Sequence, residues 1–238
     1  MNKDEFSKEL IEKADKINIK INDEKADKFY KYMNILLEWN EKINLTAITD
    51  PKDIILKHFI DSATILKYIE KNKDIIDVGT GAGFPGIPLN ILKDDNKYIL
   101  IDSLNKRINF LNETINTLKL ENIQTVHSRI EDFAKNNREK YDIATSRAVA
   151  PLNILLEYLI PLVKVGGICI CMKGSNLSEE VENSKKSLDV LGGKIENIEK
   201  IMLPDSDIVR NIIIVRKIKQ TSTKYPRKAG IPSKEPII

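Results

Sequence analysis

The segment Ile75-Ile76-Asp77-Val78-Gly79-Thr80-Gly81-Ala82-Gly83-Phe84-Pro85-Gly86 decides the fold of this chain. Its first residues have the apolar character of a buried strand, and four of the chain's ten glycines follow within eight residues. A glycine-rich turn between a strand and a helix lets the main chain approach a ligand closely and directs backbone N–H groups at it. The segment therefore predicts a cofactor loop at the end of a strand.

The spacing of these glycines narrows the kind of cofactor. The pattern Asp77-x-Gly79-x-Gly81-x-Gly83 differs from the G-x-G-x-x-G of dinucleotide-binding enzymes, and Phe84 stands where that pattern has its third glycine. None of the seven tyrosines begins a Tyr-x-x-x-Lys pair. These features disfavour a nicotinamide-dependent oxidoreductase, which stays open as an alternative. A tight glycine turn that binds no ligand is the other alternative.

A carboxylate follows the loop at the distance typical of nucleotide-binding folds. The short strand Tyr98–Ile101 ends in Asp102, about twenty residues beyond the loop, where such folds place an acid on the ribose hydroxyls. An ionised carboxylate accepts both hydrogen bonds of a vicinal diol. Asp102 or Ser103 also begins the next helix, so capping is a second role. We expect each residue to serve one of the two roles.

Short apolar strands alternate with helical stretches after residue 73, which is typical of a doubly wound parallel sheet. We predict strands at 74–78, 98–101, 123–127, 141–145 and 168–172, and helices at 86–93, 104–119, 129–136, 151–164 and 177–190. Two further strands, 194–203 and 208–218, follow each other without a helix and must pair antiparallel. The predicted fold class is α/β, with a domain at 73–218 that ends in an antiparallel hairpin.

A helical extension precedes this domain at residues 1–72, and its last helix is predicted to start at Asp50-Pro51. The whole chain has 238 residues, of which 42% are hydrophobic, as in a globular protein. No apolar run is long enough for a membrane span or a signal peptide, so we expect a cytoplasmic protein without membrane contact. Cys169 and Cys171 are expected in the core, and no metal site is expected.

Residues 219–238 are predicted to form a basic tail. From Arg216 to Lys234 there are seven basic residues and no acidic one, which suits contact with a phosphate backbone. A solvated, disordered end is the alternative, but the prolines and the aromatic residue favour an ordered strap. We expect this tail to lie away from the cofactor loop. The residues expected to contact RNA are Lys224, Tyr225, Arg227, Lys228, Lys234 and, at the tip of the fifth strand, Lys173.

The order of elements, with a glycine loop after the first strand and an acid after the second, resembles the S-adenosylmethionine-dependent methyltransferase fold over residues 74–218. Longer strings cover nearly the whole chain and resemble the bacterial RsmG (GidB) family. They are Trp39-Asn40-Glu41-Lys42-Ile43-Asn44-Leu45-Thr46, Lys57-His58-Phe59-Ile60-Asp61-Ser62, the glycine loop, Ser146-Arg147-Ala148-Val149-Ala150-Pro151-Leu152 and Tyr225-Pro226-Arg227.

This resemblance implies a seven-stranded, Rossmann-like fold and an enzyme that uses S-adenosyl-L-methionine. It implies methylation of N7 of a guanine in 16S ribosomal RNA, in the 530 loop of the small subunit. The partner would be small-subunit ribosomal RNA or the 30S particle, and we expect a monomer. A noncatalytic RNA-binding or ribosome assembly factor on the same fold is the alternative.

The resemblance also implies the residues of the site. Those expected to hold the methionine and ribose parts of the cofactor are Asp77, Gly79, Gly81, Gly83 and Phe84. Those expected at the ribose and adenine are Asp102, Ser103, Leu104, Ile130 and Glu131. A carboxylate at Glu131 can accept a hydrogen bond from the adenine amino group, although this residue could instead be a first-turn acid near the helix dipole.

Arg147 follows the fourth strand, at the carboxyl edge where a doubly wound sheet binds its ligands, and is the expected catalytic residue. Its planar donor fork would pair with the cofactor carboxylate or position the guanine, and a salt bridge to a helix acid is the structural alternative. His58 and Asp61 lie three residues apart on one predicted helix. They either line the substrate entrance or fasten the helical extension to the core.

The sequence lacks the motifs of two other methylation chemistries. The Asn/Asp-Pro-Pro-aromatic tetrad often used on exocyclic amino groups is replaced by Ser146-Arg147-Ala148-Val149. Carbon-5 pyrimidine chemistry needs a cysteine nucleophile in the cleft, whereas both cysteines lie within a strand. A ring nitrogen can attack a sulfonium methyl in line without first losing a proton, so positioning suffices and we expect no general base.

Overall fold

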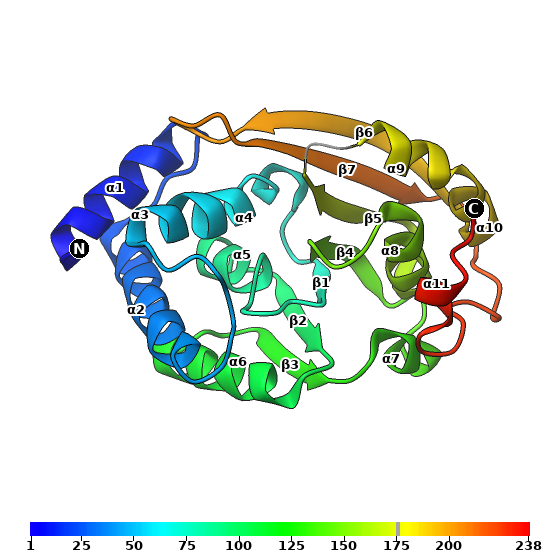
Figure 1. Cartoon of the computed structure of the whole chain (residues 1–238), viewed down its shortest axis with the longest axis horizontal. Helices are drawn as coiled ribbons and strands as arrows, with labels where there is room; N and C mark the ends of the chain where they lie inside the picture. Colours follow the sequence, from blue (N-terminus) through cyan, green and yellow to red (C-terminus); the bar gives the residue numbers. More distant parts are fainter. Residues whose placement is uncertain (175–176) are drawn as a thin grey trace.

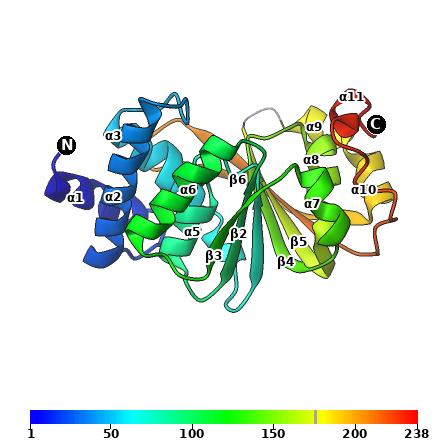
Figure 2. The same ribbon diagram turned by 90° about the horizontal axis from the view of Figure 1, so that it is seen from below.

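A seven-stranded sheet runs through the centre of the computed structural model, which describes residues 1–174 and 177–238, and helices cover both of its faces (Figure 2). The order across the sheet is β3-β2-β1-β4-β5-β7-β6. The strands are β1 (Asp74–Val78), β2 (Lys97–Asp102), β3 (Ile123–His127), β4 (Tyr141–Arg147), β5 (Val163–Lys173), β6 (Gly193–Met202) and β7 (Val209–Lys217).

The first five strands are parallel, and β7 pairs antiparallel with both β5 and β6. The predicted parallel sheet with a terminal hairpin is therefore confirmed. Because β1 lies between β2 and β4, the chain first forms β2 and β3 on one side of β1 and then crosses over to form β4 and β5 on the other side. Ligands of doubly wound sheets bind at such a reversal, outside the carboxyl ends of the strands.

Each face of the sheet has its own set of helices (Figure 2). One face packs on α5 (Gly86–Leu92), α6 (Asn105–Leu118) and the N-terminal helices, and the other on α7 (Ile130–Asn136), α8 (Leu152–Leu159) and α10 (Lys185–Leu191). Side chains alternate between these cores with the period of two of a strand, as Ile75 and Ile76 do. Cys169 and Cys171 both lie in the α8 core, as predicted.

The helical extension shares a core with the sheet. Helices α1 (Lys3–Asp15) and α2 (Asp23–Asn40) begin at Asn2 and Asn22, whose side chains accept hydrogen bonds from the first turn. Their buried apolar residues belong to the same cluster as β1 and β2. On α2, Tyr32 is fully buried, and its hydroxyl donates a hydrogen bond to the carbonyl oxygen of Ala82 in the glycine loop. The extension therefore anchors the loop directly.

The segment after Asp50 is helical, as predicted, but it is not one regular helix. Asp50 caps α3 (Pro51–Ile54), accepting from the N–H groups of Lys52 and Asp53. The chain then widens into the π-helical turn η1 (Ile55–Ile60) before α4 (Asp61–Ala63), and the 3₁₀ turn η2 (Leu66–Tyr68) comes last. Wide turns of this kind are frequent at functional sites, and η1 carries His58.

Two other predicted helices differ from the helices in the structure. The helix predicted at 151–164 ends at Leu159 and is followed by the 3₁₀ turn η3 (Ile160–Leu162). Pro161 lacks the N–H that an α-helix needs at this position. Val163, which was predicted as helical, already pairs with Tyr141 in the sheet. The helix predicted at 177–190 is two helices, α9 (Ser178–Asn183) and α10, separated at Ser184. The Ser184 hydroxyl bonds back to the carbonyl oxygen of Val181 and tightens the turn.

The C-terminal tail is ordered along α8, and its short helix α11 (Ile231–Lys234) lies beside α7 and α8 (Figure 1). This confirms the strap and contradicts a disordered end. Within the described ranges, no helix has both the length and the apolar character needed to cross a membrane.

The Tyr32 anchor can be tested with a matched pair of variants. Tyr32→Phe leaves the buried Ala82 carbonyl without this donor and should lower the free energy of unfolding by about 1–2 kcal/mol. Tyr30→Phe is the control, because it removes a hydroxyl on the same helix that makes no hydrogen bond within the described part of the chain. Urea unfolding of both variants measures the difference. Equal losses would contradict the anchor.

Candidate functional site

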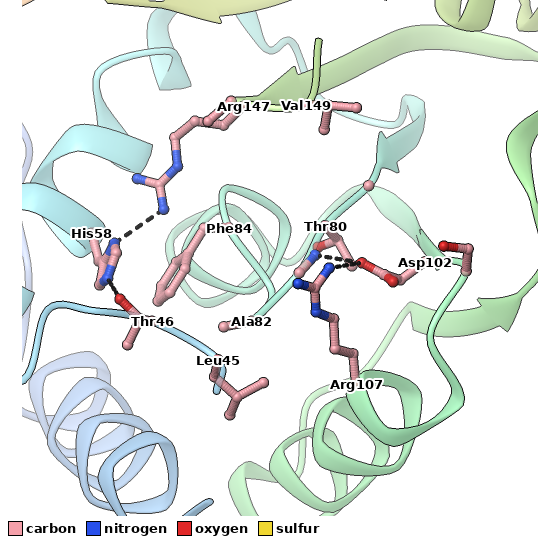
Figure 3. Close-up of a pocket in the computed structure, with 14 residues that line it drawn as sticks. Leu45, Thr46, His58, Thr80, Ala82, Phe84, Asp102, Arg107, Arg147 and Val149 are labelled. Carbon is pink, nitrogen blue, oxygen red and sulfur yellow. Dashed lines mark hydrogen bonds and ion pairs between the residues drawn. The ribbon is translucent and has the colours of Figure 1, made fainter. Parts of the chain in front are cut away.

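A cavity of about 400 Å³ lies at the carboxyl ends of β1, β2 and β4 (Figure 3). The glycine loop forms its floor, Asp102 and Arg107 lie on one side, and Arg147 and His58 lie on the other. Leu45 and Thr46 of the helical extension complete the wall. The structure thus brings the loop, the acid after the second strand and the arginine after the fourth together, as predicted.

Gly81 is the loop glycine that opens onto this cavity. Its φ is +60°, and a Cβ built on it would meet no atom within 4 Å. A Cβ on Gly79 would come within 2.6 Å of Val149 Cγ2, and one on Gly83 or Gly86 would collide with side chains packed around the loop. Gly81 is therefore favoured by its positive φ and leaves open space toward the cavity, whereas close packing restricts the other three positions.

Asp77 lies beneath the loop and does not line either of the two cavities that the loop and Asp102 border. Its Oδ2 accepts hydrogen bonds from the Thr80 hydroxyl at 2.6 Å and the Gly86 N–H at 2.9 Å. Complete burial raises the pKa of this carboxyl to about 6. The predicted direct contact of Asp77 with a cofactor is replaced by a supporting role, because the carboxylate is used to shape the loop.

Asp102 borders the 400 Å³ cavity with both of its oxygens already hydrogen-bonded. Oδ2 accepts from the Gly81 N–H at 3.0 Å and from Arg107 Nη1 at 3.2 Å, and Oδ1 accepts from the Leu104 N–H at 2.9 Å. Neither Asp102 nor Ser103 caps α6, whose N-cap is Leu104 without a side-chain hydrogen bond, so the predicted capping role is wrong. Leu104 itself is exposed and lines neither of the two cavities that Asp102 borders.

A second cavity, of about 200 Å³, continues from Asp102 and Ser103 toward α7. Ile130 and Glu131 line it, as expected for residues at an adenine edge, and Val149 lies between the two cavities as part of both linings. Glu131 is buried, and its Oε1 accepts a hydrogen bond from the Gly230 N–H at 3.0 Å. The tail therefore reaches Glu131 on α7 and, through Ser233, the lining of this second cavity.

Arg147 joins the sheet, the loop and the helical extension. Its Nη1 donates to Asp61 Oδ2 and to the Lys57 carbonyl oxygen, both at 3.1 Å, and its guanidinium lies 4.9 Å from the centre of the Phe84 ring. Asp61 is fully buried and also accepts from Arg210 Nε at 3.0 Å. The predicted alternative of a salt bridge to a helix acid is present, but it is buried and borders the cavity.

The ring of His58 completes this cluster as a neutral group. Its burial, together with the charge of Arg147, lowers its pKa to about 3. Because arginine can only donate, Nδ1 accepts from Arg147 Nη2 at 3.1 Å, and Nε2 carries the hydrogen that is donated to Thr46 Oγ1 at 2.8 Å. The ring also stacks on Phe84 with 4.4 Å between centroids. His58 and Asp61 thus fasten the extension to the core, and His58 also lines the 400 Å³ cavity.

A third cavity, of about 360 Å³, lies on the far side of this cluster. It shares His58, Arg147 and Ala148 with the first cavity, so these residues form the partition between them. Lys57, Lys173 and Arg210 line it, with Met172 and Ile48 as apolar surface. The lining is basic overall, since Asp61 and Glu180 are its two acids.

Several predicted RNA contacts have partners inside the protein. Lys173 is nearly buried and pairs with Glu180 at 2.7 Å, Arg227 pairs with the buried Glu157 at 2.7 Å, and Tyr225 is buried. The remaining three, Lys224, Lys228 and Lys234, are exposed and form no ion pair within residues 1–174 and 177–238. Their contact with RNA stays a prediction.

Sequence reasoning missed two residues of the site. Arg107 reaches back from α6 to Asp102, and its position in the first helical turn after an acid was the available signal. Tyr32 gave no local signal, since it meets the loop fifty residues further along the chain.

The site and the fold agree with the comparisons to known proteins. The sequence pattern of the GidB family, described as rRNA small subunit methyltransferase G, matches residues 25–209. The chain belongs to this family. A relative named ribosomal RNA small subunit methyltransferase G from Acetivibrio thermocellus is 57% identical, covering 96% of this chain and 95% of its own. A relative of the same name from Clostridium botulinum strain Loch Maree is 51% identical, covering 98% and 99%.

Solved structures show the same fold at low sequence identity. M. jannaschii TYW2 in complex with AdoMet has a TM-score of 0.53 at 17% identity, covering 66% of this chain and 74% of that one. A SAM dependent methyltransferase from Aquifex aeolicus has a TM-score of 0.52 at 18% identity, covering 75% and 97%. This GidB family protein is a methyltransferase that uses S-adenosylmethionine, and the predicted family, fold and cofactor are confirmed.

Gly81 provides a test of the cofactor cavity in this GidB family protein. Gly81→Ala places a methyl group in the space of the ligand and should weaken S-adenosylmethionine binding at least tenfold, as measured by calorimetry. Gly166→Ala is the matched control, because Gly166 also has a positive φ, +88°, and open space, but lies in β5 away from the cavity. Both substitutions place a side chain at a positive φ, which destabilises the backbone conformation by a similar amount, about 1–2 kcal/mol. Equal affinities in the two variants would contradict the assignment.

The buried neutral ring of His58 predicts a pH dependence of stability. The unfolded chain protonates this ring near its ordinary pKa of 6.5, whereas the folded protein does so only near pH 3. Stability should therefore fall as the pH is lowered through this window, by up to about 1.4 kcal/mol per pH unit from this group. Urea unfolding between pH 7 and pH 5 should show a shallower decline for His58→Gln than for the native protein.

Asp77 has the opposite effect on the pH dependence of stability in that experiment. Its raised pKa means that the folded state binds the extra proton between pH 3.8 and about 6, so its contribution decreases as the pH rises. Both proteins contain Asp77, and the difference between their curves therefore reports His58. Parallel curves would contradict a neutral buried ring.

Proposed function

We propose that this chain transfers the methyl group of S-adenosylmethionine to the ring nitrogen N7 of a guanine in small-subunit ribosomal RNA. The observation that carries the proposal is the cavity floored by Gly81, with Asp102 on one side and Arg147 on the other, in a member of the GidB family. The names of the relatives support small-subunit ribosomal RNA as the substrate.

The residues present fit the cofactor. The open space at Gly81 accepts its central part, and Asp102 with Ser103 borders the path from the first cavity to the second, as a ribose site requires. Ile130 and Glu131 then line the space for the adenine. Thr46 Oγ1 accepts hydrogen bonds from Ile48 N–H and His58, which leaves its own hydrogen free to donate toward an acceptor such as the methionine carboxylate.

The cofactor supplies a methyl group on a sulfonium sulfur, so the bond to N7 forms as the bond to sulfur breaks and the positive charge passes to the purine. No proton has to be removed from the nucleophile, which fits the groups at the site. His58 is hydrogen-bonded through both ring nitrogens and its pKa is about 3. Burial raises the pKa of Cys171 to about 12 and that of Cys169 well above its ordinary value, so neither serves as a nucleophile. The protein therefore acts by holding the two reactants in line.

The 360 Å³ cavity beyond Arg147 is the place we propose for the target guanine. It adjoins the cofactor cavity through the His58, Arg147 and Ala148 partition, and Met172 and Ile48 offer surface against which a base can pack. Three of the five N–H groups of Arg147 are used within the described residues. The remaining two can donate to the guanine O6 or to a phosphate, which is the positioning role expected for Arg147.

The RNA backbone would extend from this cavity over the basic surface. Lys57 and Arg210 line the cavity, and the exposed Lys224, Lys228 and Lys234 add positive charge elsewhere on the protein. Exposed lysines suit phosphate contacts because they release counterions on binding. We expect the enzyme to act as a monomer in the cytoplasm.

Mapping of 7-methylguanosine tests this function. Incubation with S-adenosylmethionine and unmethylated small-subunit RNA should produce one 7-methylguanosine per molecule in the 530 loop, measured by nuclease digestion and mass spectrometry. Naked 16S RNA and 30S particles are compared in parallel, which identifies the preferred substrate. RNA binding without methyl transfer to either substrate would favour the noncatalytic assembly factor instead.

A further inference from the structure

The C-terminal strap, residues 219–238, is held to the protein by polar contacts, most of them partly buried. Arg138 donates hydrogen bonds to the carbonyl oxygens of Thr221 at 2.6 Å, Ser222 at 3.2 Å and Tyr225. The Tyr225 ring is part of the core around α8. Three backbone carbonyls on one guanidinium fix the path of the chain at the start of the strap.

The next contact along the strap is the ion pair between Arg227 and Glu157. Glu157 Oε1 accepts from the Arg227 backbone N–H at 2.8 Å and from Nε at 2.9 Å, while Oε2 accepts from Nη2 at 2.7 Å. The Glu157 side chain is 1% exposed. A buried carboxylate needs a charged partner, and within the described ranges the strap supplies the one that Glu157 has. Docking of the strap is therefore built into α8.

Beyond this ion pair the strap reaches the 200 Å³ cavity. The Gly230 N–H donates to Glu131 Oε1 at 3.0 Å, and Ser233 lines the cavity while its hydroxyl lies 3.2 Å from the Tyr158 hydroxyl. Glu131 lines the same cavity from α7. The strap thus contributes Ser233 to the lining of this cavity and holds a second lining residue, Glu131, through Gly230.

We propose that the strap is a positioning element of the cofactor site. Arg227 and Glu157 dock it, and Gly230 then holds one oxygen of Glu131, so that the other oxygen is set to accept from an exocyclic amino group on the purine of the cofactor. The strap thereby makes the cavity selective for adenine over a purine that carries a carbonyl at this position. The inference rests on the proposed function, which places the adenine in this cavity.

This role explains features of the strap that phosphate binding does not. A contact with RNA phosphate would favour an exposed guanidinium, whereas Arg227 has its donors on a buried carboxylate. It also explains the direct hydrogen bond between Gly230 and a cavity residue ninety-nine positions away. The exposed lysines of the strap remain available to RNA.

Calorimetry with two ligands tests the proposal on the full chain. S-adenosylhomocysteine carries the amino group, and S-inosylhomocysteine carries a carbonyl in its place. The native protein should prefer the adenosine compound by about ten- to a hundredfold, as expected for one hydrogen bond to a charged acceptor. Glu131→Gln and Arg227→Gln should both reduce this preference to a few-fold at most.

Two further variants make the result decisive. Lys219→Gln removes an exposed ion pair of the strap, with Asp189, and should keep the full preference. The double variant Glu157→Gln/Arg227→Gln removes both charges, so that no uncompensated carboxylate is buried. It should fold and still lose the preference, even if Arg227→Gln alone does not fold.

The outcomes separate this inference from the proposed function. Full adenine preference in the double variant would overturn the role of the strap, and so would equal binding of both compounds by the native protein, although the cofactor assignment would then stand. Binding of neither compound by the native protein would overturn the proposed function and the inference with it. Loss of preference with Glu131→Gln and with the double variant supports the inference.

Discussion

The buried ion pair between Asp61 and Arg147 is the interaction on which the rest of the site depends. Arg147 ends β4, whereas Asp61 begins α4 directly after the π-helical turn of the N-terminal extension, so the pair joins two parts of the chain that are eighty-six residues apart. Removing Asp61 would leave the charge of Arg147 uncompensated in a buried position, which is strongly destabilising, whereas removing Arg147 would leave Asp61 with Arg210 as its partner. The pair therefore fixes how the extension sits over the glycine loop.

The charges around this pair do not cancel. Asp61 accepts from both Arg147 and Arg210, and His58 beside them stays neutral because its pKa is about 3. One carboxylate thus faces two guanidinium groups. The excess of positive charge lies at the partition between two cavities, where a polyanionic substrate and a carboxylate-bearing cofactor would both be attracted.

The parts of the structure that depend on local sequence were predictable, and those that depend on distant contacts were not. The alternation of short apolar strands with helices gave the parallel sheet, and Asp50-Pro51 gave a helix start, because these features are set by neighbouring residues. The wide turn at Ile55–Ile60 has no such signal. The partner of Arg227, Glu157, is seventy residues away on α8. The charge of Arg227 alone therefore suggested a contact with RNA, whereas its guanidinium is already paired with this carboxylate inside the protein.

The partition formed by His58, Arg147 and Ala148 has an energetic consequence for the two cavities that it separates. A ligand that binds Arg147 from one cavity would change the position or the free N–H groups of Arg147 that a ligand in the other cavity meets. By thermodynamic linkage, the factor by which a bound cofactor changes the affinity for the base equals the factor by which the base changes the affinity for the cofactor. Any coupling across this partition would therefore change the affinity for the second ligand by the same factor, whichever of the two ligands binds first.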